Sequence, residues 1–316
     1  MGKKNAISVV LLGIVLAVIP VYLGNPYYIS VLSYVGIYCL ITIGLSLLMG
    51  FAGQISLGHA AFYGIGAYTS GILISNYGMG VWPSFAVAIL VSGILALIVG
   101  IPTLRLTGHY LAMATLAFGI IVYIFFEAAV GITGGPSGLP VVSDFGIGNW
   151  MIDSEIEFYY LIWFFAFITL VLSLNIVHSR IGRALLSIHS SETAAKAMGV
   201  NTSRIKIQIF VLSACLTSLA GCFYSQKIMF ISPSAFGFKF SVTLVTMVAV
   251  GGMTSLWGAI AGTILLAILP ECLSGFEDYY LLIYGGIMII IMMFLPQGFL
   301  VALVQGIGKL FRKIEV

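Results

Sequence analysis

The stretch "SRIGRALLSIHSSETAAKAMGVNTSRIKIQ", residues 179–208, is the only long polar passage in an otherwise apolar chain. Apolar runs long enough to cross a bilayer flank it on both sides. Each Arg or Lys at the centre of a membrane helix costs about 2.5–3.5 kcal/mol, whereas each Leu or Ile returns only about 0.3–0.6 kcal/mol. We therefore expect the loop 179–206 to stay in water with its five basic residues, Arg180, Arg183, Lys196, Arg204 and Lys206.

The whole chain has the composition of a polytopic membrane protein. Of its 316 residues, 61% are apolar and 7% are charged, whereas soluble chains are about 25% charged. A membrane helix needs about 20 mostly apolar residues, and such runs recur along the chain. The sequence thus predicts an all-α, polytopic transmembrane bundle in one domain, 1–316. The ten candidate spans are 6–24, 28–49, 58–77, 83–102, 109–130, 158–178, 205–230, 239–251, 256–272 and 279–300.

The charge distribution predicts how these spans are oriented. Basic residues gather at both ends of the chain and in the loop 179–206, and basic loops stay cytoplasmic. Both termini are therefore predicted inside, which agrees with an even number of spans. The acidic loops 131–157 and 272–279 then lie outside. Lys239 falls on the outer side and departs from the rule, and the short span 239–251 leaves a re-entrant helix open.

Two glycine-rich breaks interrupt the apolar runs, "MGFAGQISLGHAAFYGIGAY" (49–68) and "VGGMTSLWGAIAG" (250–262). Small residues let helices approach closely, and broken helices line substrate paths in many transporters. We favour a translocation pathway here, although glycines of this kind also serve plain packing. For His59 a packed histidine bonded to a backbone carbonyl is an equal alternative. The pathway candidates are Gly53, Gln54, Ser56, Gly58, His59, Gly252, Thr254, Ser255 and Gly258.

Motifs for chemistry are absent from the sequence. It contains no GxxxxGK[ST], HExxH or GxSxG pattern and no close pair of carboxylates within a span. We therefore expect no enzyme, no catalytic residues, no metal site and no cofactor bound by this chain. No nucleic-acid partner is expected either. A proton-coupled carrier usually has a relay of buried Asp, Glu or His, and the sequence shows no such relay.

The polar loop itself contains a short predicted helix. Ser190 or Ser191 is a suitable N-cap, Glu192 falls in the first turn, where the helix dipole favours an anion, and Gly199 stands at the expected C′ position. The helix would be about 12 Å long. Its small face is suited to a groove on a partner, or else the helix lies on lipid headgroups. That face comprises Ala194, Ala195 and Met198.

Four motifs in chain order resemble the M-type permeases of branched-chain amino-acid ABC importers. They are "GLSLLMGFAGQISLGHAAFYGIGAY" (44–68), "TGGPSGLP" (133–140), "RIGRALLSIHSSETAAKAMGVN" (180–201) and "VGGMTSLWGAIAG" (250–262). The third contains the loop that docks on the ATPase in such importers. The usual pattern has Glu directly before the Ala pair, but here Thr193 stands there and Glu192 precedes it. The coupling residues that the resemblance implies are Glu192, Thr193, Ala194, Ala195 and Gly199.

The resemblance also implies the setting of the chain. It predicts a subunit of a bacterial inner membrane, paired with an H-type permease, two ATPases that use the ATP, and an external substrate-binding protein. That protein would touch the loop 131–157, where the candidates are Gly134, Gly135, Asp144 and Glu155. Two alternatives stay open: a permease for urea or short amides in the same family, and a self-sufficient channel or ion-coupled carrier.

Overall fold

The computed structural model describes residues 3–106, 108–141, 145–147, 150–152 and 154–273, together with a few positions between 283 and 293. Most of the tenth predicted span, 279–300, lies outside the described residues, as does Asp144. Helices dominate the described part.

Nine of the ten predicted spans coincide with helices of the described part. Five helices there are long and apolar enough to cross a membrane, namely α2 with its extension, α4, α5, α7 and α10. The chain is thus an all-α, multi-pass membrane protein. The nine helices are α1 (Lys3–Leu23), α2 (Pro26–Ser46), α3 (His59–Tyr77), α4 (Val81–Thr103), α5 (His109–Ala128), α7 (Glu155–His178), α10 (Thr202–Ile228), α11 (Phe238–Gly251) and α12 (Leu256–Cys272).

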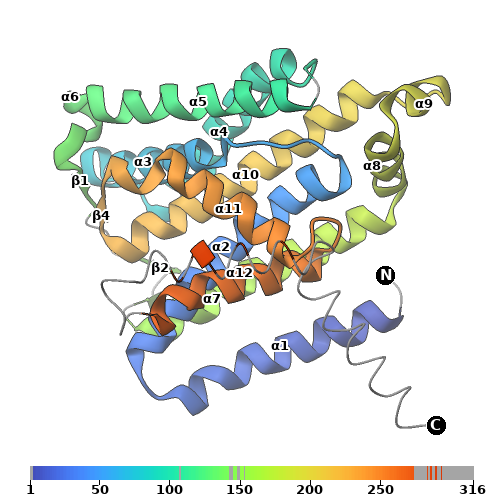
Figure 1. Cartoon of the computed structure of the whole chain (residues 1–316). Helices are drawn as coiled ribbons and strands as arrows, with labels where there is room; N and C mark the ends of the chain where they lie inside the picture. Colours follow the sequence, from blue (N-terminus) through green and yellow to red (C-terminus); the bar gives the residue numbers. More distant parts are fainter. Residues whose placement is uncertain are drawn as a thin grey trace, which may run out of the picture.

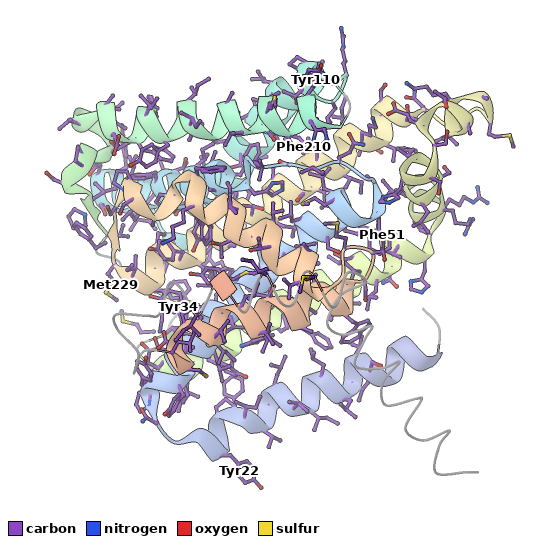
Figure 2. The ribbon with its side chains drawn as sticks, in the orientation of Figure 1. Tyr22, Tyr34, Phe51, Tyr110, Phe210 and Met229 are labelled. Atoms are coloured by element: carbon purple, nitrogen blue, oxygen red, sulfur yellow. The ribbon has the colours of Figure 1, made fainter. Side chains whose placement is uncertain are left out.

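The long helices lie side by side, and α10 is at the centre of the bundle (Figure 1). Helix α10 packs against α2, α3 and α4, while α2 also packs against α7 and α12. Helices α1 and α5 are the outermost. Their side chains Tyr22 and Tyr110 point away from the bundle, whereas Phe210 of α10 points into it (Figure 2). Apolar residues exposed on the outer helices are consistent with lipid as the surrounding solvent.

Glycines bring several of these helices into backbone contact. A Cβ built on Gly66 of α3 would overlap the carbonyl of Ser218 on α10. A Cβ on Gly221 of α10 would likewise overlap the carbonyl of Tyr63 on α3. Gly251 of α11 stands equally close to the backbone of α12. Small residues at such crossings are the usual basis of tight packing between membrane helices.

The short elements gather at the two ends of the bundle (Figure 1). At one end lie α8 (Arg180–Ser190) and α9 (Glu192–Ala197). The opposite end carries strands that the sequence did not predict, with β1 antiparallel to β4 and β2 antiparallel to β3. The elements at that end are α6 (Val130–Thr133), η2 (Gly135–Ser137), β1 (Leu139–Pro140), β2 (Gly146–Ile147), β3 (Trp150–Met151), β4 (Phe230–Ile231) and η3 (Pro233–Phe236).

Candidate functional site

Helix α9 has the two caps that its sequence predicts. The hydroxyl of Ser191 accepts a hydrogen bond from the N–H of Ala194 at 3.3 Å, so Ser191 is the N-cap. At the other end, Gly199 has φ +83°. Its N–H donates to the Lys196 carbonyl, and the N–H of Val200 donates to the Ala195 carbonyl, both at 3.0 Å. This pair of bonds is a Schellman motif, which ends the helix sharply after fewer than two turns.

Glu192 fixes α9 to the start of α10. Its carboxylate accepts hydrogen bonds from the ammonium of Lys206 at 2.5 Å and from the hydroxyl of Thr202 at 3.3 Å. Lys196 forms a second ion pair with it at 3.0 Å. Partial burial alone would raise the pKa of Glu192, but the hydrogen bonds from Lys206 and Lys196 outweigh it and hold that pKa below its usual 4.5.

Lys206 corrects one expectation from the sequence. We expected it to be in water with the other basic residues of the loop, but its side chain is 1% exposed and lies in the first turns of α10. Burying an ammonium is tolerable only when it is paired, and the partner is Glu192. Glu192, which stands one position earlier than in the usual pattern, is therefore the residue that makes this burial possible.

The exposed face of α9 also differs from the predicted one. Ala195 is buried, with 4% of its surface exposed, because it faces the rest of the chain. Thr193 and Ala194 are exposed, and Met198 is 83% exposed. The surface that α9 offers to a partner is therefore formed by Thr193, Ala194, Ala197 and Met198, which we call the α9 face.

Helix α8 connects α9 with the first glycine-rich break. It buries Gly182, Leu185 and Ile188, half-buries Ala184 and Ser187, and exposes its other residues. At its C-terminal end, His189 lies next to Gly53, where a Cβ would come within 3.1 Å of the imidazole Nδ1. Gly53 has φ +67°, a conformation that residues other than glycine adopt reluctantly.

The first break contains a buried polar network. After α2, the chain continues through a π-helical turn, Leu47–Phe51, before α3 begins. His59 is 1% exposed, and its Nδ1 lies 3.1 Å from the hydroxyl of Ser56, while its Nε2 lies 2.8 Å from the hydroxyl of Ser213 on α10. The imidazole is thus packed, as one alternative held, but it bonds serine hydroxyls instead of a backbone carbonyl.

Further hydrogen bonds surround this network at the first glycine-rich break. The Thr115 hydroxyl accepts the N–H of Leu57 at 3.0 Å, and the Ser241 hydroxyl accepts the N–H of Ala60 at 3.2 Å. Gln54 donates to the Ala52 carbonyl at 3.1 Å, while its Oε1 is buried without a hydrogen-bond partner in the described structure. Gly58 lies directly against the Thr115 backbone.

The second break is a tight turn between α11 and α12. Gly252 has φ +110°, and the hydroxyl of Ser255 caps α12 by accepting the N–H of Gly258 at 3.1 Å. Gly258 is buried against Gly251, whereas Thr254 is exposed. Three of these four pathway candidates therefore have clear structural roles in the turn.

The structure brings the two breaks together, which the sequence did not predict. The hydroxyl of Ser46, at the end of α2, donates to the Met253 carbonyl at 3.1 Å. A Cβ on Gly50 would overlap the same carbonyl. Deeper in the bundle, the hydroxyls of Thr42 and Thr263 lie 2.7 Å apart. Sequence reasoning missed Ser46, Thr42 and Ser213, because hydroxyl residues have no periodicity that marks a contact across the fold.

The opposite end of the bundle contains the candidates for an external contact. Gly134 and Gly135 have positive φ and form a turn that is packed on α5 and η3. Glu155, the first residue of α7, forms an ion pair with Lys227 at the end of α10. The Lys227 ammonium also lies 5.2 Å from the ring centre of Phe158, within cation–π range. Glu155 therefore links two helices of its own chain.

Comparison with known proteins identifies the family. The sequence profile of a family described as "branched-chain amino acid transport system / permease component" matches residues 27–292. The chain belongs to this family. It is 34% identical over 290 residues to the high-affinity branched-chain amino acid transport system permease protein LivM of Salmonella typhimurium, covering 84% of this chain and 68% of that protein. The LivM protein of Escherichia coli K12 matches with the same identity and coverage.

A second type of permease is more distantly similar. The high-affinity branched-chain amino acid transport system permease protein LivH of Salmonella typhimurium is 27% identical over 281 residues, covering 83% of this chain and 91% of LivH. No solved structure matches the chain significantly. As a member of a family of transport permease components, the chain is a transport subunit and not itself catalytic.

Proposed function

We propose that the chain is the transmembrane permease subunit of an ATP-driven importer for branched-chain amino acids and supplies half of the translocation pathway. The family match over residues 27–292 and the similarity to LivM support this proposal. The described helices supply the apolar length that a multi-pass subunit needs.

The proposed topology has ten spans in one domain, 1–316, with both termini on the cytoplasmic side of a bacterial inner membrane. The distribution of basic residues supports this orientation. The proposed orientation puts α8 and α9 in the cytoplasm and the turn at Gly134 and Gly135 outside. The external loop 131–157 would then face a substrate-binding protein.

The proposed partners are a second, H-type permease, two ATPase subunits and that binding protein. The chain would bind no cofactor itself, because the ATPases would use the ATP. The similarity to both LivM and LivH supports a system with two permease types.

The observation that carries the proposal is the construction of α9. It is a capped helix, held to the start of α10 by Glu192 and Lys206, with an exposed face of small residues and one methionine. A force on the α9 face would reach α10 through the Glu192–Lys206 ion pair and through the short connection that follows Gly199. To shift a two-state pathway from 1:99 to 99:1, the ATPases must favour one state by about 5.5 kcal/mol.

The α9 face can be tested with Met198→Arg in the assembled transporter. A bulky charge in the middle of an interface typically costs 2 kcal/mol or more. We expect co-purification of the ATPase subunits to fall at least about tenfold, while the variant stays in the membrane. Met229→Arg is the matched control, because Met229 is 63% exposed at the opposite end of the bundle.

Unchanged ATPase binding and leucine uptake by Met198→Arg would contradict the docking role of α9.

A separate measurement tests the alternative that the chain is a self-sufficient channel or carrier. The purified chain alone in liposomes should take up no leucine, whereas a self-sufficient channel or carrier would do so.

A further inference from the structure

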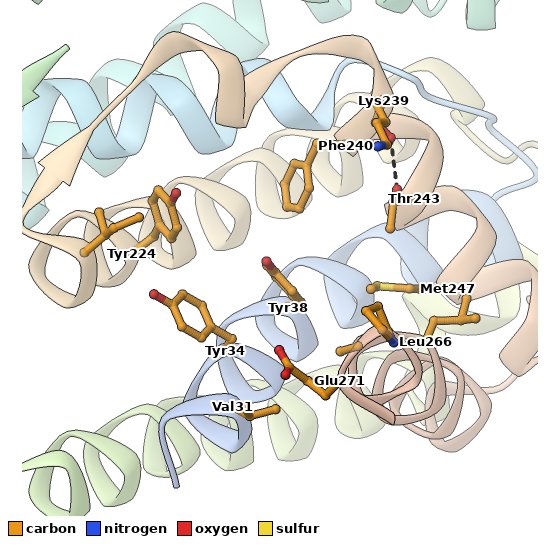
Figure 3. Close-up of a pocket in the computed structure, with 13 residues that line it drawn as sticks. Val31, Tyr34, Tyr38, Tyr224, Lys239, Phe240, Thr243, Met247, Leu266 and Glu271 are labelled. Carbon is orange, nitrogen blue, oxygen red and sulfur yellow. Dashed lines mark hydrogen bonds between the residues drawn. The ribbon is translucent and has the colours of Figure 1, made fainter. Parts of the chain in front are cut away.

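A cavity of about 430 Å³ opens between α2, α10, α11 and α12, at the end of the bundle opposite α9 (Figure 3). Ligand sites typically measure about 300–1,000 Å³. In the proposed topology this cavity lies near the outer surface, on the side from which substrate arrives.

The walls of the cavity are aromatic. Tyr34 and Tyr38 come from α2, Tyr224 comes from α10, and Phe240 comes from α11 (Figure 3). The rings pack against one another, with the centres of Tyr38 and Phe240 5.6 Å apart and those of Tyr34 and Tyr224 6.4 Å apart. Such a wall holds aliphatic groups through contact area, and its ring faces also attract a cation.

Two opposite charges line the same cavity. Lys239 is at the start of α11, and Glu271 is near the end of α12 (Figure 3). Tyr27 donates a hydrogen bond to the Glu271 carboxylate and so orients that carboxylate. Among the described residues, Lys239 is exposed and takes part in no ion pair. A lysine on the outer side also runs against the topology rule, so topology does not explain its presence.

A buried polar group stands directly behind this wall. Tyr63 of α3 is 1% exposed, and within the described structure its hydroxyl has no hydrogen-bond partner. Its ring is stacked on Phe240 at 5.0 Å and lies 5.2 Å from the ring of Tyr224. A buried hydroxyl without a partner is unfavourable, and here it adjoins two residues of the cavity wall.

We propose that this cavity is an outer holding site for a zwitterionic, aliphatic amino acid. Lys239 binds its carboxylate, Glu271 binds its ammonium, and the tyrosine and phenylalanine rings hold its side chain. The inference rests on the proposed function, and it adds a selectivity element within the permease itself. Because Lys239 is exposed, its attraction is screened by water, so the site binds weakly and releases its ligand readily.

The test uses ligands that each lack one charge. The probes are L-leucine, L-leucinamide, which has no carboxylate, and 4-methylpentanoate, which has no ammonium. Saturation-transfer NMR on the chain and its partner permease in lipid nanodiscs measures millimolar binding without the external binding protein. We expect Lys239→Ala to weaken leucine binding about fivefold and to leave leucinamide binding unchanged. Glu271→Gln should weaken leucine about fivefold and leave 4-methylpentanoate unchanged.

Two controls and a second assay separate the possible outcomes. Lys239→Arg should retain leucine binding, and Glu127→Gln, a carboxylate that does not line this cavity, should have no effect on any probe. Absence of leucine binding to the unmodified protein, or equal losses for all three probes, would overturn the holding site. Leucine uptake by the complete unmodified transporter tests the proposed function independently. Normal uptake with unchanged probe selectivity in the variants would reject the holding site alone.

Discussion

Replacing Glu192 by Gln tests whether the ion pair with Lys206 holds α9 in place. The change removes the negative charge but keeps the shape, and it leaves the ammonium of Lys206 buried, with 1% of its side chain exposed. Removing one partner of a buried pair costs about 3–5 kcal/mol. Since the Glu192 side chain is 24% exposed, water screens part of the interaction, and we expect the lower end, about 3 kcal/mol.

Hydrogen exchange measured by mass spectrometry on residues 190–200 is the suitable assay. A loss of about 3 kcal/mol in the docking of α9 raises its opening equilibrium roughly 150-fold. Exchange in α9 should accelerate by that factor, while exchange in the core of α3 and α10 stays the same. The transporter should also hydrolyse ATP with less uptake per ATP, because α9 no longer transmits force to α10.

The double variant Glu192→Gln/Lys206→Met supplies the decisive comparison. Replacing a whole buried ion pair by apolar or neutral groups is often neutral, so the double variant should recover most of the lost protection. If Glu192→Gln alone leaves exchange in α9 unchanged, the ion pair does not fix the helix. The same conclusion follows if the double variant exchanges faster than the single one.

Three further predictions concern charge, hydrogen bonding and packing. Because the folded state holds the pKa of Glu192 below its usual 4.5, its stabilisation is complete above that value and is lost as pH falls through the folded pKa. Protection of α9, corrected for intrinsic exchange, should therefore be constant from about pH 7 to pH 5 and decline below about 4.5. Ser213→Ala leaves the buried Nε2 of His59 without its partner and should lower the unfolding free energy by about 1–3 kcal/mol, seen as a lower midpoint in thermal unfolding. Gly50→Ala forces the Met253 carbonyl to move and should destabilise by about 1–3 kcal/mol. Gly131→Ala, which meets nothing within 4 Å, should not lower the same midpoint.

The sequence was informative wherever the signal is local. Apolar run length located nine helices within a few residues of their observed bounds. Capping chemistry located both ends of α9, because a hydroxyl before a helix and a glycine after it act on neighbouring backbone groups. The two glycine-rich breaks could also be found from composition alone.

Contacts across the fold could not be predicted in this way. Lys206 looked like one more basic residue of a solvated loop, because its burial depends on Glu192, fourteen positions earlier in the chain. Ala195 looked equivalent to Ala194, since only the docking of α9 distinguishes its inner face from its outer face. His59 gave no indication of its partner Ser213, which is 154 positions away.

The backbone contacts between α3 and α10 have a mechanical consequence. Packed helices can move by small sliding motions between their side chains. At Gly66 and Gly221, however, the main chains of α3 and α10 are in direct contact. Helices α3 and α10 are therefore expected to move together as one rigid body. From Lys206 to Lys227, helix α10 spans about 32 Å at 1.5 Å per residue. A displacement applied at the α9 end of α10 is therefore expected to tilt α3 and α10 together and to shift Tyr224 in the wall of the outer cavity.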